Sequence, residues 1–192
     1  NVRVLLTDSA YQVFYDINHP GMLINDSRYS MVLTQILPWI AIHLHLPLKL
    51  VIISYSVSFI LVGYVCWLIT AYLMRQRQAA TLMLFVLLAI GGTFLHCISE
   101  SLQLMFYVPM LYAWMCYGNR RQEVGDEEIW RKVLYYIIMA LLVALAFFIY
   151  PMAVFYILFA VGFRLLKEGK PRIDVPAIAT AVLLLAFIGL IS

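Results

Sequence analysis

The chain has 192 residues, of which 65% are hydrophobic and only 12% carry a charge. Its mean hydropathy is +0.93, whereas the apolar share of a soluble domain is closer to half, so the composition excludes an ordinary soluble protein and indicates a lipid bilayer. The formal net charge is only +3, and the sequence contains no basic tract and no glycine-rich phosphate loop, which argues against nucleic acid as a partner.

A polar-containing segment, residues 1–49, precedes the long apolar runs. Its first predicted helix reads SAYQVFYD and is capped by Thr7 or Asp8, whose side-chain oxygens can accept from the free amides of the first turn. Helical spacing divides its side chains into an aromatic face and a polar face, Tyr11, Phe14 and Tyr15 against Asp8, Gln12 and Asp16. Pro20 and Gly21 then favour a turn that ends the helix.

A second helix is predicted over residues 27–46, with Asp26 or Ser27 as its cap. Its apolar side chains form one stripe, which consists of Leu33, Leu37, Ile40 and Leu44. Because polar and amphipathic residues occupy the rest of its surface, we expect this helix to lie along the membrane surface rather than to cross it. His43 and His45 are two residues apart and point to different sides of a helix, which disfavours a shared metal ion.

Six apolar segments follow, and each approaches the roughly 20 residues that a transmembrane helix needs. They are residues 50–74, 79–98, 102–117, 133–150, 152–166 and 175–191. The expected fold is therefore all-α: a polytopic membrane helix bundle of about six transmembrane helices in residues 50–192, with an extracytoplasmic helical loop in residues 1–49. An earlier span ending near residues 4–6 is the simplest way to carry that loop outside, so we expect the chain to be a fragment.

The basic residues indicate the orientation of these spans. Ten of the 13 lysines and arginines lie in three alternate joints, around residues 75–77, 120–132 and 164–172. The joints between them, near Glu100 and Pro151, contain none. Because basic loops stay on the cytoplasmic side, residues 1–49, Glu100 and Pro151 are predicted to face the opposite compartment.

Other residues within the apolar segments have structural interpretations. Cys66, Cys97 and Cys116 have no CxxC spacing, so they are predicted to be buried thiols. Gly91 and Gly92 are expected at a close helix contact, and Pro109 is expected to bend its helix. Most tyrosines fall near span ends and are interpreted as interfacial anchors: Tyr55, Tyr64, Tyr72, Tyr107, Tyr112, Tyr117, Tyr135 and Tyr136.

The order of parts in residues 7–58 resembles the first outer loop of GT-C-type membrane glycosyltransferases. The shared features are an early acid at Asp8, a juxtamembrane helix, the Arg28-Tyr29 pair, a helix reading TQILPWIA, and the LPLK stretch before the next span. The layout is similar to that of protein O-mannosyltransferases and of aminoarabinose transferases. Where many relatives have an Asp-Glu pair, this chain has Asp8-Ser9, which leaves metal dependence open.

The resemblance implies a sugar transfer on the outer side of the membrane, from a polyprenyl-phosphate donor to an acceptor hydroxyl or amine. Asp8 would match the loop acid that takes the proton of the acceptor. The leaving phosphate needs a cationic partner, for which Arg28 offers a bidentate fork and Lys49 a further charge. His19 is a further substrate-binding candidate. The implied location is the bacterial inner membrane, with residues 1–49 in the periplasm.

Glu100 is the second predicted site acid, since an ionisable residue between two apolar spans is a functional candidate by default. It would orient a substrate or share a divalent metal with Asp8, and His96 is a weaker associate one turn earlier. Structural roles remain open for the same residues: Asp8 as a helix cap, Arg28 as a headgroup anchor or a partner of Asp26, and Glu100 as a solvated loop residue.

Two other classes of function compete with a transferase. A non-catalytic membrane subunit or scaffold would dock other membrane protein subunits through its outer helices. A transporter is less favoured, because no charged residue lies deep in a predicted span.

Overall fold

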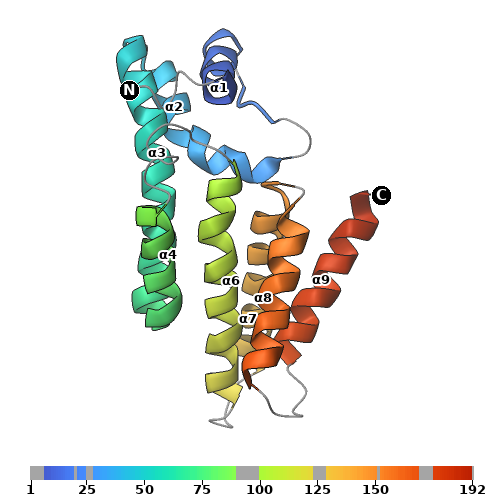
Figure 1. Ribbon diagram of the computed structural model, residues 1–192. Coiled ribbons are helices and arrows are strands. Elements are labelled where there is room, and N and C mark those ends of the chain that lie inside the picture. The colour runs from blue at the N-terminus through green and yellow to red at the C-terminus, as the bar shows by residue number, and fades with distance from the viewer. Residues whose placement is uncertain are drawn as a thin grey trace.

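The computed structural model describes residues 7–19, 21–24, 28–89, 100–122, 129–150, 152–168 and 175–191. Every regular element in these ranges is a helix, and they contain no strand, so the all-α prediction is confirmed. Long helices stand side by side, and a short helical layer crosses one end of them (Figure 1).

The layer consists of two helices from the leading segment. Helix α1 spans Thr7–Asn18, and a 3-10 turn η2 at Tyr29–Met31 leads into α2, Val32–His43. The second helix is therefore shorter than the predicted 27–46. It ends early because His45 has a φ of 52°, the left-handed conformation that commonly terminates a helix, and the amide of Leu46 donates to Ala41 O at 3.0 Å.

Helix α3, Leu48–Leu68, follows directly and packs extensively on α2. It continues into a π-helical turn η3, Ile69–Leu73, and helix α4 returns over Arg77–Ala89. Arg75 ends the π turn with a φ of 54°, and the amide of Gln76 donates to Thr70 O at 3.0 Å. The predicted Gly91–Gly92 contact lies outside the described residues.

The remaining helices are α6, Glu100–Gln122, α7, Ile129–Phe147, α8, Ala153–Glu168, and α9, Val175–Ile191. Among the described residues two stretches are long and apolar enough to cross a membrane, Leu48–Leu73 and Ile129–Phe147. Shorter apolar helices occupy Ala153–Leu166 and Val175–Gly189. Pro109 lies inside α6, which continues through it.

The helix ends alternate between the two ends of the bundle (Figure 1). We call the end crossed by α1 and α2 the layer end, and the other the far end. Helix α6 begins at the layer end with Glu100, whereas Arg75 and Arg77 lie at the far end between α3 and α4. Helices α1 and α2 and the first residue of α6, Glu100, therefore occupy the same end, away from that basic joint.

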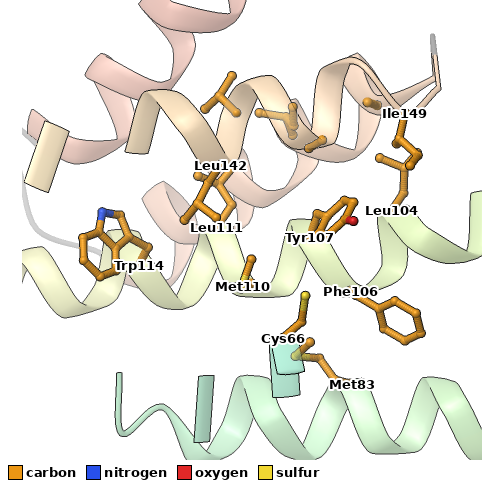
Figure 2. Close-up of a cluster of buried hydrophobic side chains, with 14 of the residues drawn as sticks. Cys66, Met83, Leu104, Phe106, Tyr107, Met110, Leu111, Trp114, Leu142 and Ile149 are labelled. Atoms are coloured by element: carbon orange, nitrogen blue, oxygen red, sulfur yellow. The ribbon is translucent and has the colours of Figure 1, made fainter. Parts of the chain in front are cut away.

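Close packing joins α3 and α6 in the centre. The rings of Phe59 and Phe106 meet edge to face at a centroid distance of 5.9 Å. A Cβ added at Gly63 would lie 2.7 Å from the Phe106 ring, so any larger residue there would force the ring to move. Met83, Leu104, Leu111 and Leu142 extend this apolar cluster across the neighbouring helices (Figure 2).

Candidate functional site

Helix α1 buries Asp16, a residue of the face that the sequence indicated as polar, together with Val13. Val13 and Asp16 are buried, with exposed fractions of 5% and 3%, whereas Tyr11 and Phe14 are 58% and 66% exposed. Ile17 is exposed as well. The aromatic face therefore points away from the protein, and an aspartate points into it.

Asp16 is the main candidate site residue that sequence reasoning missed. Its Oδ1 accepts a hydrogen bond from the amide of Leu23 at 3.3 Å, and its buried Oδ2 has no partner among the described residues. Burial raises the pKa of this carboxyl from 3.8 to about 6, against the smaller lowering effect of the Leu23 hydrogen bond. The group therefore gains and loses its proton close to neutral pH.

Gln35 on α2 belongs to the same cluster. Its side chain is fully buried, and its Nε2 donates to Leu23 O at 2.8 Å. Its Oε1 is buried without a partner in the described part of the chain. The Leu23 backbone thus links Asp16 to Gln35, and we call these three residues the layer cluster. It presents two unsatisfied acceptor oxygens, a costly arrangement in the absence of a ligand or water.

Helix α2 likewise buries polar side chains and exposes apolar ones. Thr34 and Gln35 are buried, while Ile36 and Ile40 are 39% and 41% exposed. Of the predicted apolar stripe, Leu33 and Leu37 are half-buried, and Ile40 and Leu44 are exposed. Both helices of the layer thus bury some polar side chains, Asp16 on α1 and Thr34 and Gln35 on α2, and expose large apolar ones on the opposite side.

The predicted cationic residues lie at the layer end. Arg28 is half-buried, and its guanidinium carbon lies 5.5 Å from the centre of the Tyr150 ring. The next residues fix this position, because the amide of Ser30 donates to Phe148 O at 3.3 Å. Lys49 is exposed in the first turn of α3.

His19 is exposed at the end of α1, where its ring stacks on Tyr15 at 4.1 Å. Its Nδ1 also lies 3.2 Å from Tyr15 O. These contacts hold the imidazole against its own helix.

For the two predicted acids, the structure describes only the backbone. Asp8 lies in the first turn of α1, and Glu100 is the first residue of α6. Both positions belong to the layer end, but their side chains lie outside what the structure describes, as does all of His96. Convergence of Asp8, Arg28 and Glu100 on one cavity therefore stays a prediction.

Metal ligands do not gather in the described ranges, which contain no group of three His, Cys, Asp or Glu side chains able to hold an ion. The chemistry that the layer cluster can support is proton exchange and hydrogen bonding. Comparison of the chain with protein-family models, with curated proteins and with solved structures gave no match.

Proposed function

We propose that this chain is a membrane glycosyltransferase-like protein that moves a sugar from a polyprenyl-phosphate donor to an acceptor at the layer end. The observation that carries the proposal is Asp16, a carboxyl with an exposed fraction of 3% and a pKa raised by burial to about 6, one oxygen of which has no partner among the described residues. A general base works best when its pKa lies near the working pH. A buried carboxyl held in this way is a recognised property of functional sites.

Asp16 would act through its Oδ2 atom. As the oxygen or nitrogen of the acceptor attacks the anomeric carbon, its proton passes to Oδ2, and the bond between that carbon and the phosphate oxygen breaks. The phosphate leaves on its lipid as polyprenyl phosphate. The hydrogen bond from Leu23 holds Oδ1 and leaves Oδ2 for the acceptor.

Arg28 would supply the positive charge that the phosphate requires, because a guanidinium matches phosphate oxygens in a bidentate fork. Its contact with Tyr150 keeps it at the layer end. Lys49, exposed at the start of α3, would add charge at the headgroups. For Asp8, Glu100, His19 and His96, the roles implied by the family resemblance remain part of this proposal.

The membrane arrangement that we propose has about six spans within residues 50–192, with basic joints in the cytoplasm and residues 1–49 in the periplasm of a bacterial inner membrane. The burial pattern of the layer supports it. Tyr11 and Phe14 on α1 and Ile40 on α2 would contact lipid, while Asp16 and Gln35 face the interior. A lipid-linked donor could then reach the layer cluster laterally.

The test measures sugar transfer from a radiolabelled polyprenyl-phosphate sugar in membranes that contain the wild type or a variant of one acid. Asp16→Asn keeps the shape of the side chain but removes its basicity, so we expect sugar transfer to fall by about 10²- to 10⁴-fold. Asp8→Asn and Glu100→Gln are assayed in parallel. Loss in Asp8→Asn but not in Asp16→Asn would assign the base to Asp8, and unchanged transfer in all three variants would remove the catalytic proposal.

A non-catalytic membrane subunit is the second candidate function. The exposed face of α1, formed by Tyr11, Phe14 and Ile17, favours it, because a docking helix also presents aromatic side chains outward. Unchanged transfer in the three acid variants would move the assignment to this candidate.

A further inference from the structure

The corner where α3 turns into α4, at the far end of the bundle (Figure 1), carries two exposed arginines that the proposed transfer step does not use. Arg75 follows the π-helical turn η3, and Arg77 is the first residue of α4. The sequence has no aspartate or glutamate over residues 27–99, so neither of the two joined helices contains an acid that could neutralise these charges. The corner is therefore positive.

The backbone of Arg75 adopts a conformation that favours glycine. Its φ is 54°, and the turn around it is fixed by hydrogen bonds, from the amide of Met74 to Ile69 O at 2.9 Å and from the amide of Gln76 to Thr70 O at 3.0 Å. A side chain in the left-handed region costs free energy that glycine would avoid. We therefore expect the exposed side chain of Arg75 to have a use of its own.

Arg77 adds its charge at a place that is already positive. The first turn of α4 is the positive end of the helix dipole, which disfavours a neighbouring cation and attracts an anion. An anion at this corner would offset the charges of both arginines and of the helix end.

The surface beside the arginines is aromatic and apolar. Tyr72 and Leu73 are 70% and 69% exposed. The Tyr72 ring meets Trp67 edge to face at 5.9 Å, and Trp67 stacks on Tyr64 at 5.7 Å. Tyr64 and Leu61, also exposed, continue this surface along α3 towards the layer. Leu61 to Tyr72 covers about 16 Å at the helical rise, close to the half of a bilayer core of about 30 Å that one leaflet contributes.

We propose that this corner binds an anionic phospholipid of the leaflet at the far end. Its phosphate would lie against the guanidinium groups of Arg75 and Arg77, which match phosphate oxygens in a bidentate fork. Its acyl chains would run along the exposed side of α3 from Tyr72 towards Leu61. Tyrosine and tryptophan rings are common at the depth where headgroups meet acyl chains, which agrees with the rings beside Arg75.

Charge and length favour this ligand over others. A free phosphate would leave the apolar surface from Leu61 to Tyr72 uncovered, and a zwitterionic lipid would bring an ammonium group towards two arginines. A second copy of the chain, related by a two-fold axis through this corner, would bring two more arginines to it. The inference is independent of sugar transfer and goes beyond it.

The test titrates the full chain in a nonionic detergent with phosphatidylglycerol and, separately, with phosphatidylcholine of the same acyl chains. Native mass spectrometry counts the lipids bound to each copy. The wild type should bind phosphatidylglycerol more tightly. We expect Arg75→Gln and Arg77→Gln each to weaken that binding about fivefold, and the double variant about 25-fold, the factor expected for basic residues near an anionic lipid surface. Binding of phosphatidylcholine should change little.

Two further variants separate lipid binding from a structural role. Arg75→Gly removes the charge and suits the left-handed backbone, so it should keep the turn and still lose affinity for phosphatidylglycerol about fivefold. Lys132→Gln is the matched control, because Lys132 is an exposed cation in the first turn of α7 at the same end. It should leave the tightest binding of phosphatidylglycerol unchanged.

Equal affinity of the wild type for the two lipids, or unchanged binding of phosphatidylglycerol by the double variant, would overturn the site. An equal loss in Lys132→Gln would also overturn it, because the attraction would then be spread over the whole far end. Displacement of the lipid by an equal concentration of glycerol phosphate would assign the arginines to a free phosphate. A dimer that dissociates in the double variant would assign the corner to a second copy.

Discussion

The hydrogen bonding of buried polar groups differs between the two ends of the bundle. Towards the far end, Trp114 and Tyr135 stack at 5.3 Å, the indole Nε1 donates to Tyr135 O at 3.1 Å, and the Tyr135 hydroxyl donates to Trp114 O at 3.3 Å. At the layer end, oxygen atoms of Asp16 and Gln35 are buried without partners among the described residues. Away from that end, Trp67 Nε1 is likewise buried without a partner in those ranges, and the Arg164 side chain near the end of α8 is fully buried.

This difference separates structure from function. Reciprocal hydrogen bonds between two helices stabilise the bundle and leave no capacity for a ligand. Buried acceptors without partners cost stability, and proteins keep such groups mainly where a ligand or a reaction uses them. The layer cluster is therefore the better candidate for contact with a substrate, and the Trp114–Tyr135 pair the better candidate for stabilising the bundle.

Outside catalysis, the largest expected effect is a change in the packing of α1 with pH. The pKa of Asp16 is raised from 3.8 to about 6. Between these two pH values the Asp16 carboxyl is therefore protonated when α1 is packed and ionised when α1 is detached. Packing of α1 should weaken as pH rises from about 4 to 6 and then stay constant, by about 3 kcal/mol in all, because one pKa unit corresponds to about 1.4 kcal/mol. Hydrogen exchange of α1 amides at pH 4 and pH 7 measures this change.

Asp16→Asn provides the control for this pH effect. The amide does not titrate in the range, so exchange of α1, corrected for its intrinsic pH dependence, should be equal at the two values. A pH effect that persists in Asp16→Asn would show that another group is responsible.

One matched pair of substitutions should show a smaller difference, in the free energy of unfolding, between the two ends. Tyr135→Phe removes a hydrogen bond to Trp114 O and should lower the free energy of unfolding by about 1 kcal/mol. Tyr107→Phe removes a hydroxyl that has no partner among the described residues, so stability should stay the same or rise by up to about 1 kcal/mol. Unfolding in detergent measures both, and equal losses would contradict the comparison.

The smallest effect is expected for Lys49, because its side chain is exposed and screened by solvent. Lys49→Gln should weaken binding of polyprenyl phosphate only a few-fold, in line with about 1 kcal/mol for a lysine near a membrane surface, and added salt should reduce the difference. A loss that does not depend on salt would instead indicate a direct contact with the phosphate.

Much of the fold could be predicted from the sequence, because long apolar runs strongly favour helices. The second predicted span was residues 79–98, and its described part is α4, Arg77–Ala89. The third, residues 102–117, lies within α6, Glu100–Gln122. Helix ends depend on local backbone geometry, such as the left-handed His45, and were predicted less well.

The site was predicted less well, for a physical reason. The pattern of α1 sets Asp8, Gln12 and Asp16 on one side, and a polar face is normally assigned to water. Asp16 accepts from the amide of Leu23, seven residues away, and the carbonyl of Leu23 accepts from Gln35, a connection that no local pattern reveals. Tyr107 was interpreted as an interfacial anchor because it lies near a span end, yet only 1% of it is exposed.

The apolar stretch that supports the layer has one further consequence. Leu48–Leu73 contains 26 residues, which span about 39 Å at a helical rise of about 1.5 Å per residue. The hydrocarbon core of a typical bilayer is only about 30 Å thick, so in the proposed membrane arrangement this helix would have to tilt or extend beyond the acyl chains. Because α2 is joined to the start of α3 by a tight turn, the thickness of the surrounding membrane would set the height at which the layer rests.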